Sequence, residues 1–100
     1  MPNLERRRVI GAHAMISHVR LQRGFVLGMH QHDNEQFVCV LSGRIRFTLG
    51  GAEGGRKVDV GPGEVLHLPG NAPHAAEALE DTVVLDIFSP PSAETGIDRR

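Results

Sequence analysis

The sequence predicts an all-β domain built as an antiparallel sandwich or barrel. Runs of four to eight residues rich in Val, Ile, Leu and Phe alternate with turn-forming Gly, Pro, Asn and Asp. No window carries a helical apolar stripe longer than two turns. Short strands at regular intervals, separated by turn signals, are typical of antiparallel folds with two packed layers.

The apolar runs define the strands, each bounded by residues that favour turns. The expected strands lie near residues 7–10, 14–22, 25–30, 36–41, 44–49, 56–60, 64–68, 73–79 and 83–89.

The connections between these strands contain residues that favour turns. Ser42-Gly43 is short enough to join two alternating strands as a tight hairpin. The Gly-rich stretch 50–55 predicts a flexible loop. Gly61-Pro62-Gly63-Glu64 places proline at the second position of a turn, where its fixed φ fits. In the next turn, Asn71 tolerates a positive φ better than other non-glycine residues.

Length and charge limit the range of functions. One hundred residues suit one domain, and we expect residues 1–100 to form it, with a loosely held tail at 92–100. The 11 basic and 12 acidic residues nearly balance, which argues against a nucleic-acid partner. The cluster Arg6-Arg7-Arg8 is short and follows an acid, so we interpret it as the solvated start of a strand.

The chain shows no feature of a membrane or secreted protein. No apolar run reaches the roughly 18 residues that a membrane helix needs. The N-terminus lacks the apolar region of a signal peptide. Cys39 is the single cysteine, so no intramolecular disulfide can form. These observations predict a cytoplasmic protein with no membrane partner.

The expected strand at 36–41 is apolar on both of its faces. Side chains alternate along a strand, so Val38 and Val40 share one face, whereas Phe37 and Leu41 share the other. A strand with one face exposed to solvent would carry polar residues on that face. We therefore expect the barrel interior to cover one face and a second layer or subunit the other, and we predict a homodimer.

Two segments carry residues that suit a metal ion. One contains two histidines spaced two apart at a strand end, which therefore point to the same face, and it continues into a glutamine. The other is a Pro/Gly turn that ends on a histidine. Three imidazoles and an amide oxygen can hold one divalent transition metal such as Zn, Ni, Fe or Mn. The expected ligands are His30, His32, Gln36 and His74.

These two segments resemble the two conserved motifs of small single-domain cupins. In the first motif a glycine, the His-x-His pair, an acid and a second glycine follow one another at set intervals; in the second, Gly, Pro-x-Gly and His do so. The matching positions are Gly24, His30, His32, Gln36 and Gly43, then Gly63, Pro69, Asn71 and His74. The motif's final asparagine falls on Ala78. The resemblance covers roughly residues 14–89 and implies a jelly-roll (double-stranded β-helix) barrel with a metal site.

The main departure from the cupin motif is Gln36, where many cupins have glutamate. Glu35 is adjacent but has the opposite strand parity, so it should point away from the metal. A β-bulge would bring Glu35 in instead, and this alternative stays open. With three imidazoles and an amide as ligands, the charge of the metal is not compensated by the protein. Such a site favours an anionic ligand such as a carboxylate.

The last strand contains a second candidate feature. Asp86 stands inside the otherwise apolar run 83–89 and shares a face with Phe88. A carboxylate in an apolar strand costs free energy unless it is paired or solvated. One reading is a single solvent-facing position; the other places Asp86 in the barrel mouth as a general acid or base, with Phe88 as a pocket wall.

This strand and the His-x-His-x-x-Glu-Gln segment are similar to those of the pectin-degradation type of cupin, related to enzymes that linearise 4,5-unsaturated monouronates. In that group the matching aspartate and aromatic residue belong to the active site, as does an arginine just after the two prolines. Asp86 and Phe88 match, whereas the arginine position falls on Ser92. A serine cannot bind a carboxylate bidentately as arginine does.

Three functions are compatible with the sequence. The first is an enzyme that uses the metal as a Lewis acid and Asp86 for proton transfer on a small carboxylated or sugar-derived substrate. The second is an Fe-dependent oxygenase, and the third is a non-enzymatic module that binds a small molecule or metal. The other histidines, His13, His18 and His67, lack a motif, although the last two would reach a pocket if their strands faced one.

Overall fold

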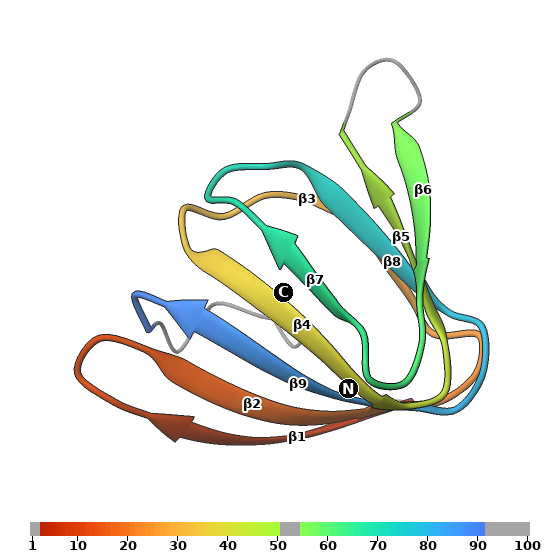
Figure 1. The fold of residues 1–100 in the computed structure, drawn as a ribbon, viewed down its shortest axis with the longest axis horizontal. Helices are drawn as coiled ribbons and strands as arrows, with labels where there is room; N and C mark the ends of the chain where they lie inside the picture. The colour runs from red at the N-terminus through yellow and green to blue at the C-terminus, as the bar shows by residue number, and fades with distance from the viewer. Residues whose placement is uncertain (1–2, 51–54, 92–100) are drawn as a thin grey trace.

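The computed structural model describes residues 3–50 and 55–91, which form β-strands and connections without a helix (Figure 1). No helix in these residues is therefore long and apolar enough to cross a membrane. The strands are β1 (Leu4–Ile10), β2 (Met15–Leu21), β3 (Val26–His30), β4 (Glu35–Ser42), β5 (Ile45–Leu49), β6 (Arg56–Val60), β7 (Val65–Leu68), β8 (His74–Ala78) and β9 (Thr82–Ser89).

The strands form two antiparallel sheets that face each other (Figure 1). We call them the five-stranded sheet, in the order β1-β2-β9-β4-β7, and the four-stranded sheet, in the order β3-β8-β5-β6. Every strand predicted from the sequence is present, and the prediction of an all-β jelly roll is confirmed. The first strand begins at Leu4 rather than at residue 7, so the arginine cluster lies within it.

Alternation along the strands places the core between the two sheets. In β2 and β9 every second residue is buried, as the two-residue period of a strand requires. Twelve buried apolar residues of the described chain pack into one cluster, to which β4 and β5 also contribute. Its fully buried members include Val19, Val38, Val40, Ile45, Leu68 and Val84.

The connection at Ser42-Gly43 is not the hairpin that its length predicts. β4 pairs with β9 and β7, whereas β5 pairs with β6 and β8, so the turn carries the chain from one sheet to the other. Gly43 has a φ of 87°, and a Cβ there would lie 2.3 Å from the Asp81 carbonyl oxygen. The Thr82 hydroxyl holds this crossing, because it accepts from the Arg44 N–H and donates to the Glu80 carbonyl.

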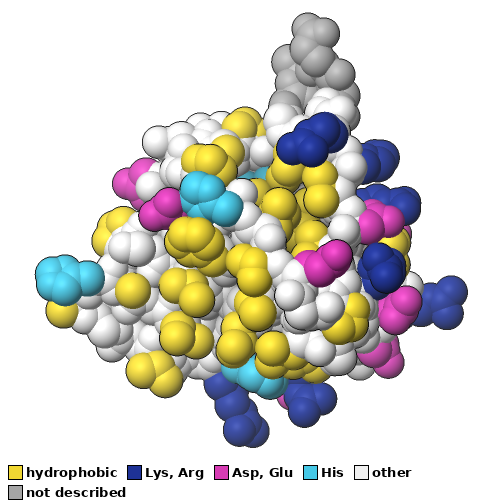
Figure 2. Space-filling view, in the orientation of Figure 1, with side chains coloured by type: hydrophobic (Ala, Val, Ile, Leu, Met, Phe, Trp, Pro, Cys, Tyr) yellow, Lys and Arg dark blue, Asp and Glu magenta, His cyan; other side chains and the backbone are white. Residues whose placement is uncertain are grey.

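The outer face of the five-stranded sheet carries a continuous apolar surface (Figure 2). The strand register aligns one row of outward-facing apolar side chains across the neighbouring strands β1, β2, β9 and β4. Ile16 in this row is 46% exposed and Phe37 is 37% exposed, which is high for residues of their size in a folded chain. The row consists of Val9, Ile16, Ile87 and Phe37.

The sequence predicted a homodimer, and this outer face is where we expect two copies to meet, because burial of apolar surface drives association. Ile16→Lys places a charge within the row and should convert the dimer to a monomer. Val26→Lys is the matched control, since Val26 is 65% exposed but lies on the four-stranded sheet. Light scattering at micromolar concentration measures both variants. A monomeric wild-type protein under these conditions would contradict the prediction.

Candidate metal centre

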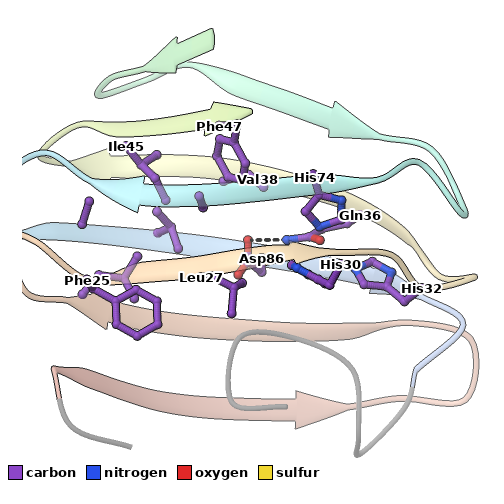
Figure 3. Close-up of a pocket in the computed structure, with 14 residues that line it drawn as sticks. Phe25, Leu27, His30, His32, Gln36, Val38, Ile45, Phe47, His74 and Asp86 are labelled. Carbon is purple, nitrogen blue, oxygen red and sulfur yellow. Dashed lines mark hydrogen bonds between the residues drawn. The ribbon is translucent and has the colours of Figure 1, made fainter. Parts of the chain in front are cut away.

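Three histidines from two separate segments lie together at one end of the barrel (Figure 3). His30 ends β3 and pairs in register with His74, which begins β8. His32 lies in the loop between β3 and β4. Their ligand nitrogens all lie within 4.8 Å of one another. The pairing of β3 with β8 therefore joins the two histidine segments of the sequence.

Each of these rings is held by a backbone carbonyl two residues away. Since a carbonyl oxygen only accepts, the Nδ1 atom of each ring carries the proton and Nε2 keeps its lone pair. That is the tautomer in which Nε2 can bind a metal, and a hydrogen bond through the other nitrogen is usual for metal-ligating histidines. The Nδ1–O distances are 2.9 Å for His30 to Gly28, 3.1 Å for His32 to Asn34 and 2.8 Å for His74 to Ala72.

Gln36 supplies the oxygen beside the histidines. Its side chain faces inward and is 5% exposed. Its Nε2 donates to Asp86 Oδ1 at 3.1 Å, and its Oε1 lies on the side of the imidazoles (Figure 3). Glu35 points to the outer face, where its Oε2 lies 2.7 Å from His67 Nε2. Strand alternation predicted that Gln36 faces the histidines and that Glu35 points away from them, and the positions of both side chains agree with this prediction.

Contacts between loops hold the two histidine segments against each other. The Asn71 N–H donates to the His32 carbonyl oxygen at 2.7 Å, and Asn71 has the positive φ, 64°, that its place in the turn suggested. Beside it, a Cβ on Gly70 would lie 2.8 Å from the Asp33 carbonyl oxygen, so only glycine fits there. The buried Asn34 side chain donates to the Pro90 carbonyl at the end of β9.

Asp86 is fully enclosed next to this cluster. It is 1% exposed, and burial raises its pKa to about 7, although the hydrogen bond from Gln36 opposes the shift. Its second oxygen, Oδ2, has no hydrogen-bond partner among the described residues, and the same holds for the hydroxyl of Ser17. Ser17 is the register partner of Asp86 on β2. The reading of Asp86 as a solvent-facing position is therefore wrong.

Burial also sets the charge of one histidine. It lowers the pKa of His74 to about 4, and the neighbouring rings of His30 and His32 act in the same direction, while the Ala72 carbonyl opposes them. The His74 imidazole is therefore neutral at neutral pH, which is the form that binds a metal.

A small cavity runs from the histidines into the barrel. Asp86 lies between its polar end and an apolar end lined by Phe25 and Phe47 (Figure 3). Its volume is about 20 Å³, which is enough for about one water molecule. The apolar side chains thus fill most of the barrel interior beside Asp86.

The two histidine segments and the strands around them match one family. The profile described as "Cupin domain" covers residues 17–88. The chain belongs to the cupin family. This confirms the resemblance drawn from the two motifs.

Solved structures support the same placement. KdgF from Halomonas sp. is 31% identical, with a TM-score of 0.84 over 93% of this chain and 84% of that chain. An RmlC-like cupin from Shewanella frigidimarina is 19% identical, with a TM-score of 0.83 over 93% and 81% of the two chains. Oxalate decarboxylase from Bacillus subtilis, described with Mn(II) centres, is 24% identical, with a TM-score of 0.79 over 90% of this chain and 26% of that chain. A comparison with curated proteins gave no match.

The remaining residues singled out in the sequence lie around this cupin site or away from it. Phe88 is 1% exposed and packs its ring against His32, with the centroids 5.8 Å apart, and it is not among the residues that line the cavity. His67 stacks on Phe37 on the outer face, and His18 lies on the outer face of β2, opposite Leu85. Ser92, the position of the family arginine, lies outside the described residues.

The sequence reasoning missed Ser17 and Asn34, which are both buried polar residues beside the site. Strand parity would have found Ser17, because it shares the inward face of β2 with Met15 and Val19. Asn34 gives no such signal, since it lies in a loop and its partner, Pro90, is distant in the sequence.

The raised pKa of Asp86 predicts how the stability of the metal-free cupin depends on pH. The folded state holds the proton up to about pH 7, whereas an unfolded aspartate releases it near 3.8. The stability that this group contributes is therefore complete below about pH 4 and is lost as the pH rises through 7. Asp86→Asn removes this dependence. Its free energy of unfolding relative to wild type should rise by roughly 4 kcal/mol between pH 4 and 8, at about 1.4 kcal/mol per pKa unit.

Denaturant unfolding in the presence of a chelator measures this difference at each pH. Asp59→Asn is the control, because Asp59 is an exposed carboxylate whose pKa is lowered by its hydrogen bond to Arg46. It should show no such gain at alkaline pH. A constant difference between Asp86→Asn and wild type would contradict the assignment of Asp86 as a carboxyl that is protonated when buried.

Proposed function

We propose that this cupin binds one divalent transition metal through His30, His32, His74 and Gln36 and acts as an enzyme on a small carboxylated or sugar-derived substrate. The observation that carries the proposal is the common tautomer of the three histidines. Three independent Nδ1–carbonyl bonds leave three Nε2 lone pairs within one small volume. A structural core would not need all three rings to be held in this way.

The donor set supports an anionic substrate. All four proposed ligands are neutral, so the charge of a bound divalent ion would be balanced by the substrate rather than by the protein. A bound metal would supply Lewis-acid polarisation of a carboxylate or carbonyl oxygen. The small free volume beneath the histidines favours a substrate of which only the reacting end enters the barrel.

Asp86 is the group we assign to proton transfer. It lines the cavity beside the histidines, and its Oδ2 is free to exchange a proton with a substrate atom. A pKa of about 7 lets one carboxyl both hold and release a proton at neutral pH. Its enclosure by strands β2, β4 and β9 fixes its position relative to the substrate.

The similarity to KdgF supports a sugar-derived acid as the substrate class. The pectin-degradation resemblance extends to Asp86 and to Phe88, which packs against the ligand His32. Ser92 stands where that group has an arginine, so a uronate would lose a bidentate contact with its carboxylate. We therefore assign the class of substrate and not the monouronate itself.

The metal assignment predicts one divalent ion per chain in protein purified without added metal. His74→Ala removes one imidazole and should lower metal affinity by at least about tenfold, because a ligand of the ion is lost. His67→Ala is the matched control, since this histidine lies on the outer face and binds Glu35. Elemental analysis and titration with Mn(II), Ni(II) and Zn(II) measure both. Equal affinity in the two variants would show that the histidine cluster does not hold the metal.

The role of Asp86 predicts that Asp86→Asn abolishes turnover while metal content is unchanged. An amide keeps the size and the accepting oxygen of the carboxyl but cannot exchange a proton in the same way. Turnover of 4,5-unsaturated monouronates and other small sugar acids by the metal-loaded protein is the measurement. If the variant retains full activity on a substrate that wild type converts, Asp86 is not the proton-transfer group.

Further measurements on the metal-loaded protein distinguish an enzyme of this kind from the two other functions that the sequence allows. Oxygen uptake that depends on added Fe(II) would show an oxygenase. Thermal stabilisation by a carboxylate without product would show a binding module, since a ligand that binds only the folded state raises its stability.

A further inference from the structure

The most specific contact beside the proposed ligands is the hydrogen bond between two buried side chains, Gln36 and Asp86. They lie on neighbouring strands β4 and β9 and are 5% and 1% exposed. Gln36 Nε2 donates to Asp86 Oδ1 at 3.1 Å. Both groups face the cavity, so water does not compete for this contact as it would at the surface.

The polarity of this bond fixes which end of the amide faces the histidines. An amide has a donating nitrogen at one end and an accepting oxygen at the other, and only the oxygen can bind a metal. Oδ1 of Asp86 accepts from the nitrogen end of Gln36, which leaves Oε1 on the side of the imidazoles (Figure 3). Without this partner, the side chain could present either end.

The same contact restricts which residue can stand at position 36. A glutamate there would place a second carboxylate oxygen about 3 Å from Asp86 Oδ1, where the N–H donor now lies. When Asp86 is ionised, as above pH 7, two acceptors at that distance have no hydrogen atom between them. A glutamate would fit if the partner on β9 were an amide, which donates.

We propose that Asp86 is the positioning residue that turns the Gln36 amide oxygen toward the metal, and that Asp86 is the reason this cupin uses glutamine rather than glutamate as a ligand. The inference rests on the proposed metal site, and it gives Asp86 a function in metal binding besides proton transfer. The two residues form a matched donor–acceptor pair.

The first test compares two substitutions of Asp86. Asp86→Leu removes the acceptor, so Gln36 loses its orientation and the affinity for Mn(II) should fall by roughly 10- to 100-fold, as for other residues that orient a ligand. Asp86→Asn keeps an accepting oxygen and should bind Mn(II) as wild type does. The electronic spectrum of Co(II)-loaded protein should change in Asp86→Leu and remain wild-type in Asp86→Asn.

The second test exchanges the polarity of the pair in metal-free protein. Gln36→Glu alone should lower Tm by about 5 °C or more at pH 8, because two acceptors then meet in a buried site. The double variant Gln36→Glu/Asp86→Asn restores a donor opposite an acceptor, so Asp86→Asn should raise Tm at pH 8 by more in the Gln36→Glu background than it does in wild type. It should also bind Mn(II), now through a carboxylate ligand.

The outcomes separate this inference from the proposed function. If wild type binds no divalent ion, the metal site itself is wrong. If wild type binds Mn(II) but Asp86→Leu has the same affinity and the same Co(II) spectrum, Asp86 does not position Gln36. If Asp86→Leu does not fold, the double variant decides, because an equal gain in Tm from Asp86→Asn in wild type and in Gln36→Glu would overturn the matched pair.

Discussion

Pairing between β3 and β8 is the contact on which the candidate metal centre depends. It places His30 opposite His74 and so joins two segments that are more than forty residues apart in the sequence. The bond from the Asn71 N–H to the His32 carbonyl then brings the loop histidine to the same point. Backbone hydrogen bonds, which are short and directional, thus bring the candidate ligands together, and the Phe88 ring packs against one of them, His32. Rings held in this way can accept a metal with little reorganisation.

Placing a carboxyl among the apolar residues of β9 has a cost in stability. Among the described residues, Asp86 Oδ1 accepts from Gln36 and Asp86 Oδ2 has no partner, in surroundings that favour the neutral form of the carboxyl. An apolar residue there would extend the core without this cost. Strain and unsatisfied polar groups of this kind are typical of functional sites, where the group serves chemistry rather than folding. The unpaired Ser17 hydroxyl on the next strand belongs to the same polar region.

The two faces of the five-stranded sheet carry different kinds of side chain. Its inner face carries Gln36, Asp86 and the ring of Phe88, while its outer face carries an apolar row that crosses four strands. Because side chains alternate, each strand of this sheet contributes to both faces at once. A small barrel buries a modest share of its surface by itself, so an apolar outer face would serve to increase that share through a second copy.

Local patterns in the sequence determined the strands, the parity of Gln36 and Glu35, and the candidate ligand set, because alternation and turn chemistry act over a few residues. Tertiary structure decided which strands pair. Ser42-Gly43 has the length of a hairpin turn, yet it joins two sheets. The strand before it, β4, pairs with β9 and β7, whereas the strand after it, β5, pairs with β8 and β6. The burial of Asp86, its bond to Gln36 and the histidine tautomers likewise depend on contacts between distant segments. Such contacts leave no periodic signal in the chain, since only the packed sheets create them.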